Sequence, residues 1–236
     1  MNIKKFITSR DLKIIAYVTM LIDHIGAVVL IHLLGNYGNY NLSMDYNTLF
    51  ETYTLLRTIG RISFPIFAFG IVEGFVHTSN IKKYLVRLLI FALISEIPFD
   101  LALRGNPIFW ESQNVIWTFL LGILALYFGK KYNNQLLTLV FVFVAMVLGE
   151  YLKTDYGAYG VALMFAFYYL RTSPIKYLIW GIIIYSNTPY GLISLIPMFL
   201  YNGQKGMKSG RWLYGFYPVH FLILYLVIQI IKITFV

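Results

Sequence analysis

Residues 12–34 read LKIIAYVTMLIDHIGAVVLIHLL, and this stretch decides the fold class. A helix needs about 20 consecutive apolar residues to cross a bilayer, and the stretch supplies them. It is too long for the apolar region of a cleavable signal peptide, and no small-residue cleavage site follows it. We therefore expect a retained membrane-spanning helix, with Asp23 and His24 near its middle.

The composition of the whole chain points the same way. Hydrophobic residues fill 59% of the 236 positions and charged residues 12%, and the mean hydropathy is +0.70. Soluble domains are roughly 45–50% apolar and about 25% charged. The excess is too large for one soluble core of this length, so lipid is expected to cover it. The chain has no cysteine, which excludes disulfides, thiol nucleophiles and thiolate metal sites.

Nine apolar runs divide the chain and predict an all-α polytopic membrane protein of about nine transmembrane helices. We treat residues 1–236 as a single membrane domain, since no internal repeat or soluble appendage is visible. Several middle runs fall short of the ~20 residues of a full span, so we expect helices that tilt little, extend into polar flanks, or are re-entrant. The runs lie at residues 12–34, 57–76, 84–103, 115–129, 136–150, 157–170, 175–187, 189–201 and 213–232.

Lysine and arginine gather in alternate segments between these runs, which is the pattern that fixes membrane topology. With the N-terminus placed inside, every inner segment is basic, whereas the outer segments carry the acids. The pattern accounts for the net charge of +9 without a nucleic-acid partner. We predict a multi-pass protein of the cell membrane, the cytoplasmic membrane in a bacterium, with a cytoplasmic N-terminus and an outer C-terminus. The inner basic residues are Lys4, Lys5, Arg10, Lys13, Lys82, Lys83, Arg87, Lys130, Lys131, Arg171, Lys176, Lys205, Lys208 and Arg211.

Asp23 and His24 are the most informative pair, because ionisable side chains at membrane depth are costly and usually functional. A carboxylate beside an imidazole suits a general base or a proton relay, and the alternative is a structural pair buried against Arg61 or Glu96. Lys13 lies eleven residues earlier, close to three helical turns, and therefore on the same face about 16 Å away. That spacing suits a substrate with an anionic head at the cytoplasmic mouth, although a snorkelling lysine has the same pattern.

Proline interrupts three of the apolar runs. Pro65 cannot donate to the carbonyl of Arg61 and is expected to bend its helix, and Pro98 and Pro218 act likewise in theirs. Broken helices at membrane depth tend to line cavities, although a kink also serves packing alone. These three positions therefore mark segments where a cavity is expected.

The inner end of the second run carries Glu73 and His77, which are four residues apart and able to meet on one helix face. With Arg87 on the next run, they form a mouth suited to a phosphate-bearing cofactor from the cytosol. Positive-inside topology alone explains the neighbouring lysines, but it does not explain Glu73. His220 is expected about two turns into the membrane, in a cavity shared with His24. The four histidines show no metal-ligand spacing, so no metal is predicted.

These residues occur in an order that resembles the TraX family of membrane acetyltransferases. The resemblance extends over nearly the whole chain, and the ordered set of segments is specific although no single segment is. The segments that carry it are Lys13–Ala16, Met20–Gly26, Arg57–Phe69, Glu73–Phe75 with His77, Thr78 and Asn80, Tyr84 with Arg87 and Leu88, Ser95 with Pro98 and Phe99, Asn114 with Thr118, Asp155–Gly157 with Gly160, and Tyr217–His220.

The resemblance implies a membrane enzyme that transfers an acetyl group from acetyl-CoA to an amine. The resemblance implies that the founding member of the family acetylates the N-terminus of a pilin. The implied acceptor is therefore a peptide amine, or another amine such as an amino sugar. In the type 3 acyltransferases of the wider clan, an arginine stands eleven residues before a histidine of the first helix. Here that position is Lys13, which keeps the charge but loses the bidentate fork.

On this resemblance, His24 is expected to act as the general base for the amine, with Asp23 orienting it. Arg61 and Asn114 are the candidates for stabilising the oxyanion. A proton-coupled transporter and a non-catalytic assembly factor remain alternatives, since buried charges and kinked helices also serve transport. The expected contacts to acetyl-CoA come from Lys13, Glu73, His77, Arg87, Tyr217 and His220, with Lys83 or Arg211 as further partners for its phosphates.

Overall fold

The computed structural model describes residues 5–40, 42–207 and 212–235 of the chain. Within these ranges the regular structure is helical, and β-structure is limited to two isolated bridges. The all-α prediction is therefore confirmed for the described part of the chain. Three of the predicted inner basic residues, Lys4, Lys208 and Arg211, lie outside the described residues.

The decisive stretch forms one continuous helix in three parts: α1 (Ser9–His24), the π-helical segment η1 (Ile25–Leu30) and α2 (Ile31–Gly35). A capping box starts it, because the Thr8 side chain accepts from the Asp11 N–H while Asp11 accepts from the Thr8 N–H at 2.9 Å. The wide turns of η1 begin directly after His24. Single π-turns inside α-helices occur frequently at functional sites, and this one adjoins the pair that the sequence singled out.

The second apolar run begins earlier than the sequence predicts. Helix α3 (Tyr46–Gly60) is capped by the Asp45 side chain, and helix α4 (Ser63–His77) follows after a break at residues 61–62. Pro65 lies in the first turn of α4, where its missing N–H has no intrahelical partner to lose. The proline therefore helps to begin a new helix. In place of the predicted bend, the helix is interrupted completely before Pro65.

Four helices form the body beside α4: α5 (Ile81–Arg104), α6 (Val115–Tyr132), α7 (Gln135–Tyr151) and α8 (Gly157–Tyr169). Asparagine side chains cap the first three of these by accepting from a backbone N–H of the first turn. Pro98 stays inside α5 without ending it. The opposite faces of α5 and α7 expose large apolar side chains, as expected of surfaces that meet lipid.

The next two predicted spans form a short hairpin. Helix α9 (Lys176–Asn187) has twelve residues, and η2 (Pro189–Ser194) with α10 (Leu195–Phe199) adds six and five. The chain then returns to its own beginning, where the Ile7 N–H donates to the Leu200 carbonyl at 3.1 Å. Each arm is roughly 18–20 Å long, shorter than the hydrocarbon core of about 30 Å, which agrees with the expectation of short helices in this region.

The nine or so predicted spans correspond to helices of very different lengths. Among the described residues, four helical stretches are long and apolar enough to cross a membrane, judged by length and composition. They are Ser9–Gly35, Tyr46–His77, Val115–Tyr132 and Gly215–Thr234. Shorter apolar helices accompany them, and the last stretch belongs to α11 (Trp212–Phe235), which keeps Pro218 inside it.

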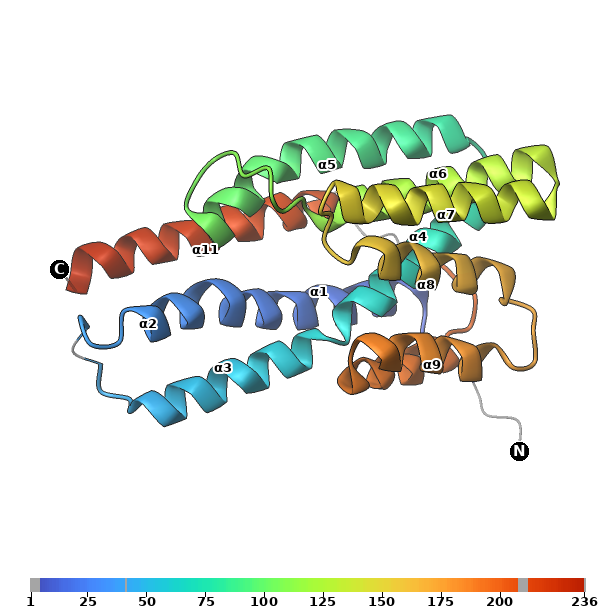
Figure 1. Ribbon diagram of the computed structural model, residues 1–236. Helices are drawn as coiled ribbons and strands as arrows, with labels where there is room; N and C mark the ends of the chain where they lie inside the picture. The colour runs from blue at the N-terminus through green and yellow to red at the C-terminus, as the bar shows by residue number, and fades with distance from the viewer. Residues whose placement is uncertain (1–4, 41, 208–211, 236) are drawn as a thin grey trace.

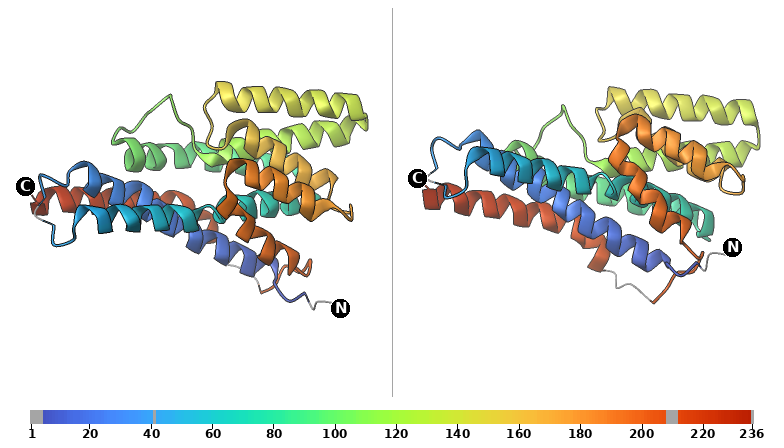
Figure 2. Two further views of the ribbon diagram at one scale, coloured as in Figure 1. Left: turned by 60° about the horizontal axis from the view of Figure 1, so that its bottom comes forward. Right: turned by 90° about the horizontal axis from the view of Figure 1, so that it is seen from below.

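The helices run along one long axis and end at two different levels (Figures 1 and 2). The N-terminal end collects the loops that follow α4, α6, α8 and α10, which are the loops with the basic residues. The far parts of α1–α2, α3 and α11 extend beyond α6–α9 in the other direction. The gathering of the basic loops at one end agrees with the predicted topology, and we call that end the inner end.

The outer loops of the shorter helices reach the middle of the long ones. The Gln113 N–H donates to the Lys153 carbonyl at 3.0 Å, which ties the α5–α6 loop to the α7–α8 loop. The Thr118 hydroxyl donates to the Asp155 carbonyl, and its oxygen lies 2.8 Å from the Thr154 hydroxyl oxygen. These tied loops lie beside Asp23 and His24 and close off the body at that level.

Candidate functional site

Two cavities meet inside the helical body. The inner cavity, of about 210 Å³, opens between α1, α4, α5 and α6 toward the inner end, and most of its wall is apolar. The outer cavity, of about 250 Å³, lies at the level where α6 and α8 begin. The two cavities share one part of their walls. A molecule that extends along this shared part reaches both cavities. The shared residues are Met20, Phe67, Val115, Phe119 and Tyr217.

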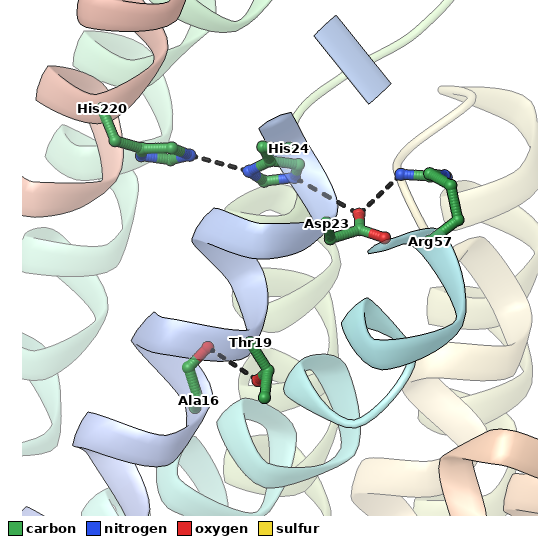
Figure 3. A network of polar contacts seen from close by, with 6 residues as sticks. All are labelled: Ala16, Thr19, Asp23, His24, Arg57 and His220. Carbon is green, nitrogen blue, oxygen red and sulfur yellow. Dashed lines mark hydrogen bonds and ion pairs between the residues drawn. The ribbon is translucent and has the colours of Figure 1, made fainter. Parts of the chain in front are cut away.

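His24 lies in the outer cavity and contacts His220 of α11 (Figure 3). The His24 Nδ1 atom is 2.7 Å from His220 Nε2, and His220 Nδ1 is 3.0 Å from the Phe216 carbonyl oxygen. The two histidines therefore lie in contact, whereas the predicted cavity shared by both is not found, because His24 lines the outer cavity and His220 does not. His220 itself is 3% exposed, so it supports His24 from behind and does not reach the cavity.

This chain of contacts fixes the proton positions of the neutral pair. A carbonyl oxygen can only accept, so the His220 Nδ1 must carry a hydrogen and its Nε2 must be the acceptor. The His24 Nδ1 then donates to His220, and the His24 Nε2 is left with its lone pair. That nitrogen is the one that faces Asp23, at 3.9 Å from its Oδ2. The geometry thus prepares one basic nitrogen in the cavity wall.

Asp23 makes its strong contact with Arg57 of α3. The Arg57 guanidinium donates to Asp23 Oδ2 at 2.6 Å. The distance from the same Asp23 oxygen to His24 Nε2 is beyond hydrogen-bond range. The contact between Asp23 and His24 is therefore longer than the predicted orienting role implies. Asp23 is instead placed to stabilise a protonated His24 by its charge. Its other oxygen, Oδ1, is buried beside Gly60 and has no hydrogen-bond partner within the described residues.

The outer cavity is rich in charge for a space inside a membrane protein. Arg57, Arg61 and Arg104 line it together with the carboxylates of Asp23 and Asp155. Arg61 sits at the break between α3 and α4, and Arg104 ends α5. With His24 neutral, three cations face two anions, so the cavity carries a net positive charge.

Asp155 is placed in the cavity by the tied loops between α7 and α8. It lies in the turn before Gly157, and its backbone N–H donates to the Gln113 carbonyl at 2.8 Å. Surrounding protein and the nearby Asp23 carboxylate raise the pKa of Asp155 from about 3.8 to about 6, against the opposing effect of Arg57 and Arg61. The side chain nevertheless faces the open cavity, where solvent reaches it.

Because the pKa of Asp155 is raised, replacing this residue with the neutral asparagine is expected to stabilise the fold by an amount that depends on pH. A carboxyl whose pKa is higher in the folded state stabilises the fold below its unfolded pKa and loses that contribution as the pH rises through about 6. Asp155→Asn should therefore raise the melting temperature in detergent relative to the wild type at pH 8, with little difference at pH 4. Melting curves of both proteins across this range check it. A difference that stays constant with pH would contradict the assigned pKa.

The inner cavity holds the residues predicted for the cofactor. Lys13, Glu73 and Arg87 line it near its mouth, together with Tyr84 and Tyr201. The predicted contact between Glu73 and His77 is present at 3.5 Å, and Glu73 also contacts Arg171 of the α8–α9 loop at 3.5 Å. His77 is itself exposed and outside the cavity wall, so its contact is with Glu73. Lys13 and Arg87, the two predicted cations, therefore lie together at the mouth of the inner cavity. His77 lies behind Glu73, outside the cavity wall.

Asn114 has a different role from the predicted one. Its side-chain oxygen caps α6 by accepting from the Ile116 N–H at 3.0 Å. Its amide donates to Glu96 at 2.6 Å and to the Ala92 carbonyl at 2.8 Å, so every polar atom is in use. The side chain is fully buried and absent from both cavity walls. The structure therefore joins Asn114 to the α5–α6 packing and separates it from the group around His24.

Three cavity residues escaped the sequence analysis. In the sequence, Arg104 and Asp155 fall in segments between apolar runs, and Arg57 begins the second run. Arg57 did carry a signal, since it lies one helical turn before Arg61 and both belong to the resembling segment. Within the described ranges, no three histidine, aspartate or glutamate side chains converge closely enough to hold a metal ion.

Comparison with known proteins decides the family. The sequence matches the family described as TraX protein over residues 9–228. The chain belongs to the TraX family. The matched residues include those that line both cavities.

A curated relative extends this TraX assignment. The probable fimbrial assembly protein FimC of serogroup H1 from Dichelobacter nodosus is 30% identical to the chain, over 91% of the chain and 93% of the relative. No solved structure matches the TraX chain. The similarity to FimC therefore spans nearly the full length of both proteins.

Proposed function

We propose that this TraX-family protein transfers an acetyl group from acetyl-CoA to an amine. The observation that carries the proposal is the unprotonated His24 Nε2 in the outer cavity, next to a second cavity with cations at its mouth. A thioester in the shared wall region can meet an amine from the outer cavity. The first requirement of such a transfer is a base, since an ammonium cannot attack a carbonyl carbon.

The donor enters from the inner end in this proposal. The phosphates of acetyl-CoA stay at the mouth, where Lys13 and Arg87 supply positive charge. The apolar wall between the mouth and Met20 accommodates the pantetheine arm. Tyr217 lies in the wall that both cavities share, so the acetyl end is placed beside it and within reach of the acceptor.

The reaction balances without a covalent enzyme intermediate. His24 Nε2 takes one proton from the acceptor ammonium, and the neutral amine nitrogen then forms a bond with the acetyl carbonyl carbon. The bond from that carbon to sulfur breaks, and the second proton of the nitrogen passes to the CoA thiolate, while His24 releases the first proton to water. Asp23 stabilises the protonated imidazole by its charge, and Arg57 holds the carboxylate in place.

The acceptor belongs to the outer side. The fimbrial relative supports a subunit of a surface fibre, and therefore a peptide amine, as the natural acceptor. The outer cavity of about 250 Å³ suits one small head group of such a molecule. The proposal is tested by acetyl-CoA consumption of the purified protein in detergent, with a panel of peptide and amino-sugar acceptors. Acetyl transfer supports it, and no turnover across the panel contradicts it.

Lys13 provides a test of the donor side. Lys13→Ala should raise the KM for acetyl-CoA roughly tenfold and leave kcat within about twofold, because a charge-assisted contact to a phosphate contributes about 1.5–3 kcal/mol to binding. Initial rates at varied acetyl-CoA measure both constants. The matched control is Lys131→Ala, since Lys131 is an exposed lysine of the same end and lines neither cavity. An unchanged KM in the Lys13 variant would place the phosphates elsewhere.

A further inference from the structure

The cations of the outer cavity outnumber their partners. Arg57 is engaged, because it contacts Asp23 at 2.6 Å. Arg61 and Arg104 line the same cavity, and no carboxylate of the described residues comes within salt-bridge distance of either. Two guanidinium groups therefore face the space where the acceptor binds.

Arg61 is held there by the backbone. It stands in the break after α3, its N–H donates to the Thr58 carbonyl at 3.2 Å, and the residue is half-buried. Arg61 interacts with the Asp23 and Asp155 carboxylates only from beyond salt-bridge distance, and the cost of partly burying its guanidinium falls when a ligand supplies a closer negative charge. Arginine also binds phosphate and carboxylate groups in a bidentate way that a lysine does not.

Arg104 covers the same space from the outer side. It is exposed in the last turn of α5, and its guanidinium lies over the Phe109 ring at 5.2 Å from the ring centre. Arg61 therefore presents a cation on the half-buried part of the cavity wall, and Arg104 presents one on its exposed part. His24 lines the same cavity of about 250 Å³, so the anion and the reacting amine of one small molecule fit together.

We infer that the acceptor is an anionic amine, a molecule that carries a phosphate or carboxylate group close to the amine that is acetylated. This inference rests on the proposed function for the role of the amine. It adds the anion site, formed by Arg61 and Arg104, which selects such molecules over neutral amines of the same shape. Arg57 and Asp23 stay paired beside it and take no part in binding the anion.

Binding without turnover tests the anion site separately from catalysis. The probes are two matched pairs: glucosamine 6-phosphate with glucosamine, and the dipeptide Gly-Asp with Gly-Asn. Thermal melting of the full-length protein in detergent, without acetyl-CoA, gives an apparent Kd for each probe. At least one anionic member should bind roughly tenfold more tightly than its neutral partner. The pair that shows the preference tells phosphate from carboxylate.

Variants assign that preference to the two arginines. Arg61→Gln and Arg104→Gln should each reduce it about tenfold, while Arg10→Gln should keep it, because Arg10 lies at the inner end against Met207 and lines neither cavity. Equal binding within both probe pairs overturns the inference, as does a preference that survives both variants. An anionic amine that binds but is not acetylated overturns the proposed function alone. Weakened binding of acetyl-CoA in these variants, with acceptor binding unchanged, would assign the arginines to the donor.

Discussion

His24→Ala should lower the turnover of acetyl transfer at least ~100-fold, the low end of what a general base contributes. The expectation follows from the contacts of the ring. His220 and the Phe216 carbonyl fix its Nδ1 as a donor, which leaves Nε2 as the one ring nitrogen that can take a proton in the outer cavity. The measurement is kcat for acetyl transfer, with acetyl-CoA binding measured alongside.

The control for this variant lies on the same helix. His32 bonds the Tyr40 hydroxyl at 3.0 Å and lines neither cavity, so His32→Ala should keep its turnover within about twofold. Because the two substitutions are chemically identical, a large loss confined to His24 separates catalysis from packing. Near-normal turnover in His24→Ala would remove the base from the proposed mechanism.

His220 should behave as a positioning residue in the same experiment. His220→Leu removes the acceptor that holds the His24 tautomer, whereas His220→Gln keeps an oxygen that can accept from the His24 Nδ1. The glutamine variant should therefore retain more turnover than the leucine variant, and its pH–rate profile should stay closer to that of the wild type. Equal losses in both variants would indicate a packing role only.

The fold was largely predictable because lipid imposes a simple rule on the sequence. Apolar runs mark helices, and basic loops mark one side, so the helical class and the common end of the basic loops followed from composition. Helix α3 was missed because Tyr46–Gly60 mixes polar and apolar residues over its first half. The short hairpin of α9, η2 and α10 was not distinguished from two full spans, since run length alone does not show where a short helix turns back.

The site was predictable where a residue conflicts with its surroundings. Asp23 and His24 stand out because they interrupt an apolar run, and Lys13 follows from helical spacing. Arg104 sits at a loop boundary, where charge is expected, so nothing in the sequence distinguishes it. Asp155 sits at such a boundary too, and its signal is its place in the resembling segment Asp155–Gly157. The contact of His24 with His220 joins residues 196 positions apart, and only packing brings them together. Asn114 shows the reverse, since an asparagine before a helix is equally well a cap.

Gly60→Ala should disrupt the site without touching a reactive group. A Cβ at position 60 would overlap the Cβ, Cγ and Oδ1 atoms of Asp23, and the first of these is fixed to the backbone of α1. The side chain cannot swing away, so α1 and α3 must separate and Arg57 must leave Asp23. Overpacking of this kind costs typically 1–3 kcal/mol, so we expect the melting temperature in detergent to fall by roughly 5–10 °C.

Activity should fall with it, because the Asp23 charge that stabilises protonated His24 depends on the close approach of these two helices. Gly35→Ala is the matched control, since a Cβ there meets nothing within 4 Å, and it should change neither the melting temperature nor turnover. Gly26 lies between these extremes, with a Cβ placed 3.3 Å from Leu56 Cβ, so Gly26→Ala should show an intermediate loss. This graded order ties the site to the spacing of α1 and α3, because a mechanism that did not use the Asp23–Arg57 pair would leave all three variants equally active.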